Sequence, residues 1–278
     1  MTILDGGRLK GQILDRLKDK IELLDTKPNF VVIHVGHDEA SMIYLKQKEK
    51  MAKFLGYGYQ EIIFDDSVLE DEIIAKINEL NNDSNIHGIL VQLPLPSGFN
   101  SERIINTIDP VKDIDGITDK NWENLVSGKD GLIPPTALGI MKLLEDYHIN
   151  LTDKNVVIIG KSKLIGKPLE VLMSSEMAKV SLCDSQTFDL EDYTNAADII
   201  VTGVGKPNII TRDMVKIGVT IIDAGINLVD GKIVGDIDFD DMADKTNYIT
   251  PVPGGVGQMT IAMLACNIYE SYNHQIND

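Results

Sequence analysis

The chain has 278 residues, of which 43% are hydrophobic and 25% are charged, and its formal net charge is −17. This length and composition are typical of a globular protein with room for two domains. The negative charge argues against nucleic acid or an anionic membrane as a general partner, because both would repel the chain.

We expect a cytoplasmic protein without a metal site. The N-terminal stretch lacks the uninterrupted apolar core of a signal peptide, and no later stretch has the length of a membrane span. Cys183 and Cys266 lie far apart within apolar stretches, so we expect each to be a buried, reduced thiol. The five histidines show no HExxH or similar ligand spacing.

Helical and extended patterns alternate along the first half of the chain. Apolar residues at helical spacing predict a helix over 7–24, and a β-branched run predicts a buried strand over 30–36. The same criteria predict helices over 39–55, 68–80 and 101–108, and strands over 58–64 and 88–91. This alternation indicates an α/β domain.

Two segments of this half carry polar residues whose role the local sequence leaves open. Tyr44 and Lys48 are four residues apart and so share one face of the 39–55 helix, although a solvated lysine face is the simplest interpretation of that lysine-rich stretch. Gln92 precedes Pro94 and Pro96, which exclude helix and sheet just past a strand's carboxyl end. Gln92 therefore either caps the strand or contacts a ligand.

The acidic turn 109–116 is not a calcium loop, because Val111 stands where an EF-hand needs its first carboxylate. Asp115 is then either a surface carboxylate or an acceptor for a ligand with paired N–H donors. The polar segment 122–131 that follows is expected to be a loop that crosses between two domains.

In the second half, the apolar run 156–159 predicts a strand that ends at Gly160, and Gly166 with Pro168 then opens a helix. Such a strand, turn and helix N-terminus favours a phosphate. The spacing excludes a P-loop, which has four residues between its glycines instead of five, and Ser162 replaces the second glycine of the G-x-G-x-x-G pattern. This segment alone fits a nucleotide-binding turn or an ordinary connection.

Strands and helices continue to alternate beyond this turn. The expected segments are 169–175, 179–183, 190–196, 199–202 and 219–223, which together predict a parallel sheet with right-handed crossovers. Small-residue turns at 203–205 and 225–227 also follow strands, so three such turns converge at one edge and favour a dinucleotide. A hairpin turn is expected at Gly231. The segment 253–257 precedes a last helix over 259–269 and is either a ligand contact or a flexible hinge.

Taken together, six segments resemble the bifunctional methylenetetrahydrofolate dehydrogenase/methenyltetrahydrofolate cyclohydrolase family, and they cover nearly the whole chain in order. The segments are YLKQK (44–48), GILVQLPLP (88–96), KDIDG (112–116), GKSKLIGKP (160–168), TGVGKPN (202–208) and ITPVPGGVGQMTIAML (249–264).

The resemblance implies a two-domain α/β fold in which an N-terminal α/β substrate domain is followed by a Rossmann-like parallel-sheet domain for the dinucleotide. We expect the folate-binding catalytic domain at 1–120 plus 256–278, the NAD(P)-binding domain at 121–255, the folate between them, and a homodimer. The expected reactions are oxidation of 5,10-methylenetetrahydrofolate with NADP and hydrolysis of the methenyl product to 10-formyltetrahydrofolate.

The resemblance also implies roles for individual residues. Tyr44 would stack on the aminobenzoyl ring, Lys48 would be the central catalytic group with Gln92 supporting it, and Asp115 would bind the pterin through two hydrogen bonds. Lys48 would lose its proton as the methenyl cation forms and then help to deprotonate water. Further substrate contacts are expected from Val91, Leu93, Pro253, Gly254, Gly255, Val256 and Gly257. Cofactor contacts are expected from Gly160, Lys161, Ser162, Ile165, Gly166, Ser185, Gly203, Gly205, Gly225 and Ile226.

Cofactor choice is the point at which the chain departs from the family pattern. Lys161 and Lys163 stand where arginine and asparagine are common, and Asp184 and Gln186 stand where histidine and a basic residue are frequent. Asp184 would favour NAD by binding a ribose hydroxyl. Lys161, Lys163 and Ser185 favour the additional phosphate of NADP, so NADP is the expected cofactor and NAD the alternative.

Two other functions are compatible with parts of the pattern. A related dehydrogenase for an amino acid or a shikimate-like acid would leave Asp115 and the 253–257 segment unexplained. A catalytically silent NAD(P)-binding module would make the set of Tyr44, Lys48 and Gln92 accidental.

Overall fold

The computed structural model describes the backbone of residues 1–36 and 39–277, and the side chains of 39–44 and of residue 277 lie outside that description. The chain divides into two compact units: Met1–Gln12 with Pro135–Thr260, and Ile13–Pro134 with Ile261–Asp278. These limits fall within α1 (Gly6–Glu22) and α10 (Val256–Asn277) and at the start of α6 (Pro135–Asp146). The domains expected from the sequence end instead at 120 and 255.

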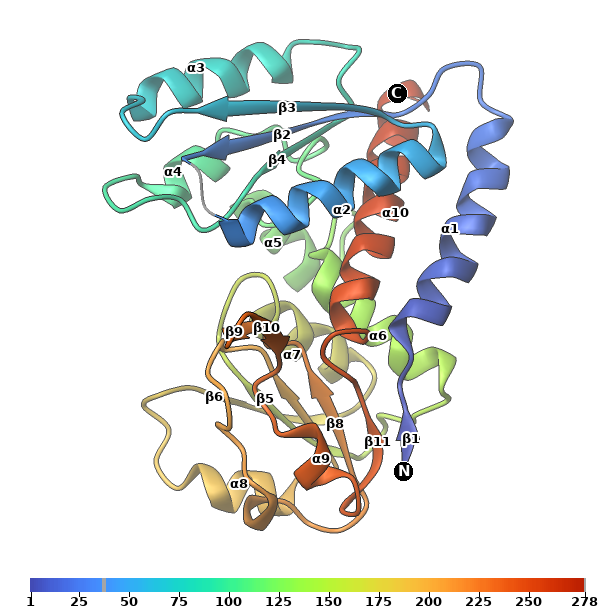
Figure 1. Cartoon of the computed structure of the whole chain (residues 1–278). Helices are drawn as coiled ribbons and strands as arrows, with labels where there is room; N and C mark the ends of the chain where they lie inside the picture. The colour runs from blue at the N-terminus through green and yellow to red at the C-terminus, as the bar shows by residue number, and fades with distance from the viewer. Residues whose placement is uncertain (37–38, 278) are drawn as a thin grey trace. The chain divides into compact units, whose positions relative to one another are not determined.

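The unit formed by Ile13–Pro134 and Ile261–Asp278 contains a three-stranded parallel sheet in the order β3-β2-β4. Its strands are β2 (Asn29–Val35), β3 (Gly58–Phe64) and β4 (Gly88–Val91). They are connected by α2 (Glu39–Leu55) and α3 (Glu70–Asn81), which lie on opposite sides of the sheet (Figure 1).

Alternation along β2 explains this arrangement, since successive side chains of a strand point to opposite faces. Phe30 and Val32 pack in one core with Leu45, Met51 and Leu55 of α2, while Val31, Ile33 and Val35 pack with Ile73 and Ile77 of α3. The first of these cores also takes in apolar residues of α1 and α10. β2 is consequently buried on both faces.

Two short helices follow β4 in this unit, α4 (Ser101–Ile105) and α5 (Asp119–Val126). The expectation of a loop over 122–131 is therefore wrong for its first five residues. The Thr118 hydroxyl caps α5 by accepting from Asn121 N. Asn121 itself is buried and donates to Pro110 O and Asp113 Oδ2. The polar residues that suggested a loop thus bind the preceding turn.

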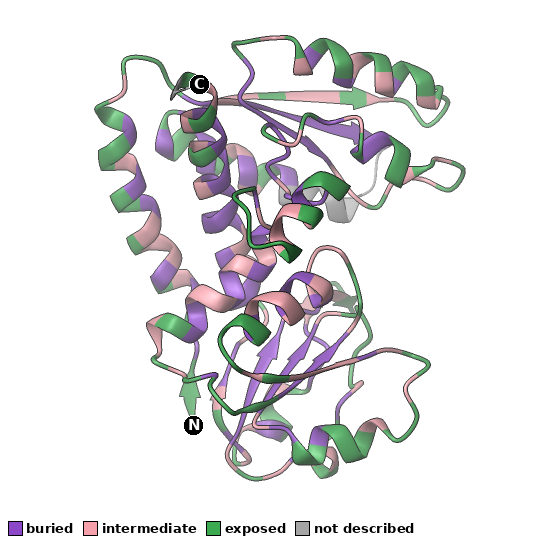
Figure 2. Cartoon of the chain, turned by 180° about the vertical axis from the view of Figure 1, so that it is seen from behind, coloured by how far each residue is buried: buried purple, intermediate pink, exposed green. Residues whose placement is uncertain are grey.

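The other unit contains a six-stranded sheet in the order β1-β11-β8-β7-β5-β6, and every neighbouring pair in it is parallel. The strands are β1 (Thr2–Ile3), β5 (Asn155–Ile159), β6 (Lys179–Cys183), β7 (Ile199–Thr202), β8 (Val219–Asp223) and β11 (Thr246–Ile249). Figure 2 shows the central strands buried. The Rossmann-like parallel sheet predicted from the sequence is confirmed.

Helices α7 (Gly166–Ser175), α8 (Leu190–Ala196) and α9 (Phe239–Met242) and the 3-10 turn η1 (Arg212–Met214) belong to the same unit. A two-stranded hairpin pairs β9 (Asn227–Val229) with β10 (Lys232–Val234) around Gly231, as the sequence predicts. No helix of the described residues combines the length and the apolar character needed to cross a membrane.

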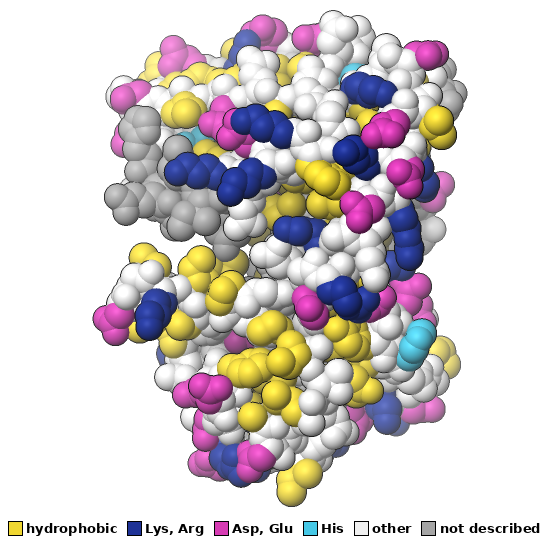
Figure 3. Space-filling model, turned by 45° about the vertical axis from the view of Figure 1, so that its right-hand side comes forward, with side chains coloured by type: hydrophobic (Ala, Val, Ile, Leu, Met, Phe, Trp, Pro, Cys, Tyr) yellow, Lys and Arg dark blue, Asp and Glu magenta, His cyan; other side chains and the backbone are white. Residues whose placement is uncertain are grey.

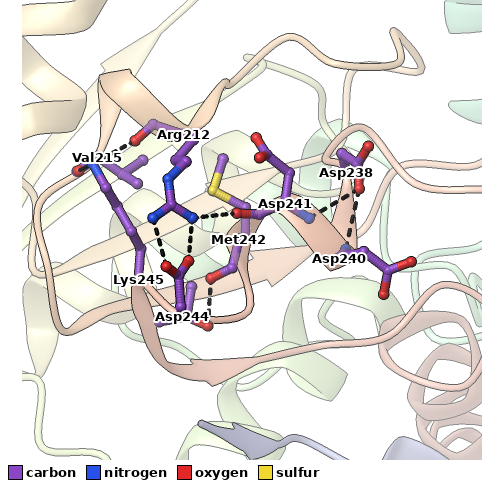
Figure 4. Close-up of polar contacts among 9 residues, drawn as sticks. Arg212, Val215, Asp238, Asp240, Asp241, Met242, Asp244 and Lys245 are labelled. Atoms are coloured by element: carbon purple, nitrogen blue, oxygen red, sulfur yellow. Dashed lines mark hydrogen bonds and ion pairs between the residues drawn. The ribbon is translucent and has the colours of Figure 1, made fainter.

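An acidic cluster around α9 has a structural role (Figure 4). Asp238 caps the helix by accepting from Asp240 N and Asp241 N, and Asp244 pairs with Arg212. Lys245 Nζ donates to Arg212 O at 2.7 Å. Within the described residues, no three His, Cys, Asp or Glu side chains are grouped so that they could hold a metal ion. On the face drawn in Figure 3, basic and acidic side chains are interspersed, so this face has no large area of positive charge alone.

Candidate active site

Lys48 of α2 and Gln92 at the end of β4 form the polar centre of the three-stranded unit. Lys48 Nζ donates to Gln92 Oε1 at 2.6 Å, although the lysine is only 7% exposed. The backbone N of Gln92 donates to Ile33 O at 2.8 Å and extends the β4–β2 pairing by one residue. Gln92 Nε2 donates to Leu93 O at 2.9 Å, which fixes the amide with its oxygen toward the lysine.

The pKa of Lys48 is lowered because burial removes water from the ammonium group. The carboxylates of Asp115 and Glu61 oppose this shift by favouring the charged form. The result is an amine that loses its proton more readily than a surface lysine and keeps a hydrogen-bond acceptor beside it. Such an amine can serve as a general base.

The loop that carries Asp115 is laid along β4. Ile89 N donates to Lys112 O at 2.7 Å, and Lys112 Nζ donates to three carbonyl oxygens at the end of α3, those of Leu80, Asn81 and Asp83. Lys112 is therefore a helix cap and not a ligand group. Gly116 has φ +63°, and a Cβ there would lie 2.7 Å from the Leu132 carbonyl oxygen, so only glycine fits after Asp115.

Burial raises the pKa of Asp115 to about 6, the nearby ammonium of Lys48 lowers it, and Asp113 raises it further. Asp115 keeps partial contact with solvent, whereas Asp113 is fully buried. Asp113 accepts from Thr118 N at 2.8 Å and Asn121 Nδ2 at 3.0 Å. The described residues give the carboxylate of Asp115 no hydrogen-bond donor, so both of its oxygens can take donors from a ligand.

The other substrate contacts expected in this unit are Tyr44, Val91 and Leu93, and they differ in burial and in how far the structure describes them. Tyr44 lies one turn before Lys48 on α2, but its side chain is outside the described residues. Val91 packs in the core on the α3 side of the sheet, so only its backbone can face a ligand beside Gln92. Leu93 is half-buried and precedes Pro94 through a cis peptide bond.

The segment Pro253–Gly257 belongs to the other unit, where it packs on the start of α1. Gly7 N donates to Gly254 O at 3.2 Å, and Gly255 N donates to Pro251 O at 2.8 Å. A Cβ on Gly6 would lie 2.1 Å from the carbonyl oxygen of Gly255. The two backbones therefore touch, and the glycines are required for this contact as well as for any ligand.

The turn after β5 is closed by two glycines. Gly160 has φ +110°, and a Cβ on Gly166 would lie 1.8 Å from Gly160 O. Ile165 N donates to Ser162 Oγ at 3.1 Å, and a Cβ on Gly203 would lie 2.8 Å from Ile165 Cδ1. Gly160, Ser162, Ile165, Gly166 and Gly203 are thus brought together at the carboxyl ends of β5 and β7.

Asp236 joins the remaining turns, and sequence reasoning missed it. Its carboxylate accepts from Thr202 Oγ1 at 3.0 Å, Val204 N at 2.8 Å and Lys206 N at 2.9 Å, all around Gly205. A Cβ on Gly225 would lie 2.2 Å from the same carboxylate, and Ile226 beside it is exposed. The only sequence signal was an acidic residue directly after a predicted hairpin.

Lys161 and Asp184 form an ion pair at 2.8 Å across the carboxyl ends of β5 and β6. Each partner favours the charged form of the other, so the pKa of Asp184 is lowered and that of Lys161 is raised. Asp184 also accepts from Gln186 N at 2.9 Å. Its carboxylate is therefore already engaged, and Ser185 beside it is exposed.

This arrangement defines a class of protein. Glycine turns gathered at one edge of a parallel sheet fit a dinucleotide. Without side chains, the protein backbone can approach the phosphates of such a ligand closely. The three-stranded unit adds a buried amine and a carboxylate to which the described residues give no hydrogen-bond donor, as an enzyme acting on a small polar substrate requires. The chain is thus a two-unit α/β protein of the dinucleotide-dependent enzyme class.

Comparison with known proteins identifies the family. Residues 4–115 match the tetrahydrofolate dehydrogenase/cyclohydrolase catalytic domain, and residues 134–276 match the NAD(P)-binding domain of the same family. The chain belongs to the tetrahydrofolate dehydrogenase/cyclohydrolase family. The resemblance inferred from the six segments is confirmed.

Relatives match over nearly their whole length. The bifunctional protein FolD of Nautilia profundicola is 46% identical over 271 residues, which are 96% of this chain and 95% of that protein. The crystal structure of the bifunctional enzyme FolD from Campylobacter jejuni matches with a TM-score of 0.96 and 43% identity, covering 99% of both chains. The Trypanosoma brucei enzyme, solved with NADP cofactor and an inhibitor, has a TM-score of 0.96 and 29% identity, covering 100% of this chain and 99% of its own.

Proposed function

We propose that this protein oxidises 5,10-methylenetetrahydrofolate with NADP and hydrolyses the resulting 5,10-methenyltetrahydrofolate to 10-formyltetrahydrofolate. Family membership over both units supports the two activities, and the relatives named above are bifunctional enzymes of that kind. The observation that carries the proposal is the buried Lys48, which has a lowered pKa and donates to Gln92.

Asp115 binds the pterin in this proposal. Its carboxylate has no donor among the described residues, and a pterin offers a ring N–H and an amino group side by side. The ionised carboxylate can accept both hydrogen bonds. Tyr44, one helical turn from Lys48, stacks on the aminobenzoyl ring, and the backbone of Pro253–Gly257 supplies further folate contacts.

NADP supplies the acceptor for the hydride that leaves the methylene carbon. Gly160, Gly166, Gly203 and Gly225, where a Cβ would clash with neighbouring atoms, would hold it together with Ser162 of the turn that leads into the N-terminus of α7. During this step the substrate is held by Lys48, Gln92 and Asp115. Holding the methylene carbon close to the hydride acceptor provides most of the rate acceleration.

Lys48 acts more directly in the hydrolysis. The positively charged methenyl product disfavours an adjacent ammonium, so the pKa of Lys48 falls further when the product forms. The neutral amine takes a proton from water as the water oxygen bonds to the methenyl carbon. The bond from that carbon to N5 then breaks, N5 receives the hydroxyl proton, and the formyl group remains on N10.

The ion pair between Lys161 and Asp184 supports NADP over NAD. A free aspartate at this strand end would bind a ribose hydroxyl and repel a phosphate. Here the carboxylate is neutralised by Lys161 and used to hold the turn through Gln186 N. The lysine can contact the additional phosphate while the aspartate stays bound to its own loop.

The protein is proposed to be a homodimer. Leu228 and Val229 of the β9–β10 hairpin are exposed apolar residues on a short two-stranded sheet, and a partner could bury them. Light scattering at the outlet of a sizing column should give twice the mass of 30.7 kDa. A mass of one chain at micromolar concentration would contradict this assembly.

The catalytic proposal is tested by assaying purified protein with methylenetetrahydrofolate and NADP. Both activities are expected in the wild type, and Lys48→Met should lower cyclohydrolase activity at least about a hundredfold, as the loss of a general base does. Wild-type ring opening in that variant would overturn the role of Lys48. Absence of both reactions in the wild type would instead favour a silent NAD(P)-binding module or a dehydrogenase with another substrate.

A further inference from the structure

His34 is a buried polar residue whose side chain has no explanation in the fold. It lies in the central strand β2 and is only 2% exposed. Neither Nδ1 nor Nε2 has a hydrogen-bond partner among the described residues. Buried polar atoms are nearly always paired, because leaving them unpaired costs the free energy of their lost hydration.

The strand pattern places His34 on the face of the sheet that carries the polar centre. It has the same parity along β2 as Phe30 and Val32, whose side chains pack with α2. Lys48 also lies on α2, so the imidazole and the amine approach the same layer of the unit from its two sides.

The register between β2 and β4 then makes Gln92 the lateral neighbour of His34. Ile33 pairs with Val91, and Gln92 N donates to Ile33 O, so the next pair across the strands is His34 and Gln92. The contact of Gln92 with Lys48 shows that its side chain is on the α2 face. Backbones of neighbouring strands are about 4.8 Å apart, so the two side chains are adjacent.

Gln92 and His34 each carry a polar group without a hydrogen-bond partner among the described residues, and the two groups are complementary. The amide nitrogen of Gln92 carries two hydrogens, of which Leu93 O accepts one, and the described residues offer no acceptor for the second. An imidazole has nitrogen atoms that can accept or donate. No direct bond joins them in the structure, and a gap of this kind between buried polar groups is where proteins hold an ordered water.

We propose that His34 is a positioning residue for the Lys48–Gln92 pair, linked to the second amide hydrogen of Gln92 through one buried water. The link holds the amide with Oε1 toward Lys48, since a rotated amide would point its hydrogens at the ammonium. This inference rests on the proposed function of Lys48. Its consequence is that His34 matters more for the hydrolysis, which uses the amine directly, than for the oxidation.

The test is the ratio of cyclohydrolase to dehydrogenase activity in one preparation, because this ratio does not depend on how much protein is folded. His34→Leu should lower the ratio by roughly three- to tenfold, the effect of losing one hydrogen bond in the site. His34→Gln, whose amide can hold the same water, should restore it. The melting temperature of the leucine variant should change little, because the loss of one water-mediated hydrogen bond is offset by the burial of an apolar side chain.

A matched control is His87→Leu. His87 is a buried histidine of the same unit, but its Nδ1 already accepts from Asn29 N at 3.1 Å. That variant is expected to lose stability while the ratio stays unchanged. His34→Met provides a flexible apolar replacement if the leucine variant does not fold.

An unchanged ratio in His34→Leu or His34→Met would overturn the proposal, and so would a parallel loss of both activities. If Lys48→Met retains ring opening, the assignment of Lys48 fails instead. If Lys48→Met is inactive in ring opening and the His34 variants keep the wild-type ratio, only the role of His34 is lost.

Discussion

Lys48 lowers the pKa of Asp115, and Asp115 raises the pKa of Lys48. The ammonium favours the ionised carboxylate, and the carboxylate favours the ammonium, while burial disfavours both charges. Burial has the larger effect on each, so the pKa of Lys48 is lowered and that of Asp115 is raised to about 6. The two groups can therefore exchange protons with ligands nearer neutral pH than they would on the surface.

Folate binding should weaken as the pH falls through the pKa of Asp115, which is about 6. A protonated carboxyl loses part of its capacity to accept the two pterin hydrogen bonds, so the KM for methylenetetrahydrofolate should rise by up to roughly tenfold per pH unit below that value. The measurement is KM against pH in the wild type and in Asp115→Asn. The variant should have a high KM that does not rise further at acid pH. If its KM still rose as in the wild type, the titrating group would not be Asp115.

Stability should depend on pH through the same residue. Because the pKa of Asp115 is raised from 3.8 to about 6, the folded state binds this proton more tightly than the unfolded chain. The resulting stabilisation is complete below the unfolded value and is lost as the pH rises through about 6. Asp115→Asn, which cannot ionise, should gain stability relative to wild type between about pH 4 and about pH 7.5, by at most about 3 kcal/mol.

Urea titrations at the two pH values measure this difference. Because Asp115 keeps some contact with solvent, a gain smaller than the upper limit is expected. A variant that becomes relatively less stable as the pH rises would show that the contact with Lys48 outweighs burial.

Gly166→Ala should abolish cofactor binding and destabilise the sheet unit. The new Cβ would lie 1.8 Å from Gly160 O, so the turn after β5 must open. Gly11→Ala is the matched control, because no atom lies within 4 Å of a Cβ there and the residue is inside α1. The control should gain about 0.5–1 kcal/mol from higher helix propensity. Thermal melts with and without NADP distinguish the two, and normal NADP binding by Gly166→Ala would contradict the proposed turn.

Lys161→Ala should lower kcat/KM with NADP more than with NAD, because it removes the positive group and leaves Asp184 free to repel a phosphate. Stability should change by less than about 1 kcal/mol, since the pair is exposed. Lys216→Ala removes a similar ion pair, 2.7 Å from Asp198 at the amino-terminal edge of the sheet, and should leave the cofactor ratio unchanged. Equal losses with both cofactors would remove Lys161 from the determinants of choice.

The sequence by itself determined the alternation of strands and helices and the family. Strong local signals made this possible: the β-branched runs of β2 and β5, the helical spacing in α1, and glycines where the backbone must turn or approach closely. These signals depend on neighbours within a few residues, so they can be read along the chain.

Only the tertiary structure decided which polar residues are buried and which groups they contact. Lys48 is surrounded by lysines in the sequence, yet it alone is described as buried among them, and Gln92, 44 residues away, accepts a hydrogen bond from its ammonium group. Lys112 in the KDIDG segment is a cap for α3, and Asp236 organises turns that begin 34 residues earlier. Burial and pairing arise from contacts between distant segments, so no local pattern encodes the pKa of Lys48 or Asp115, or the burial of His34 without a hydrogen-bond partner among the described residues.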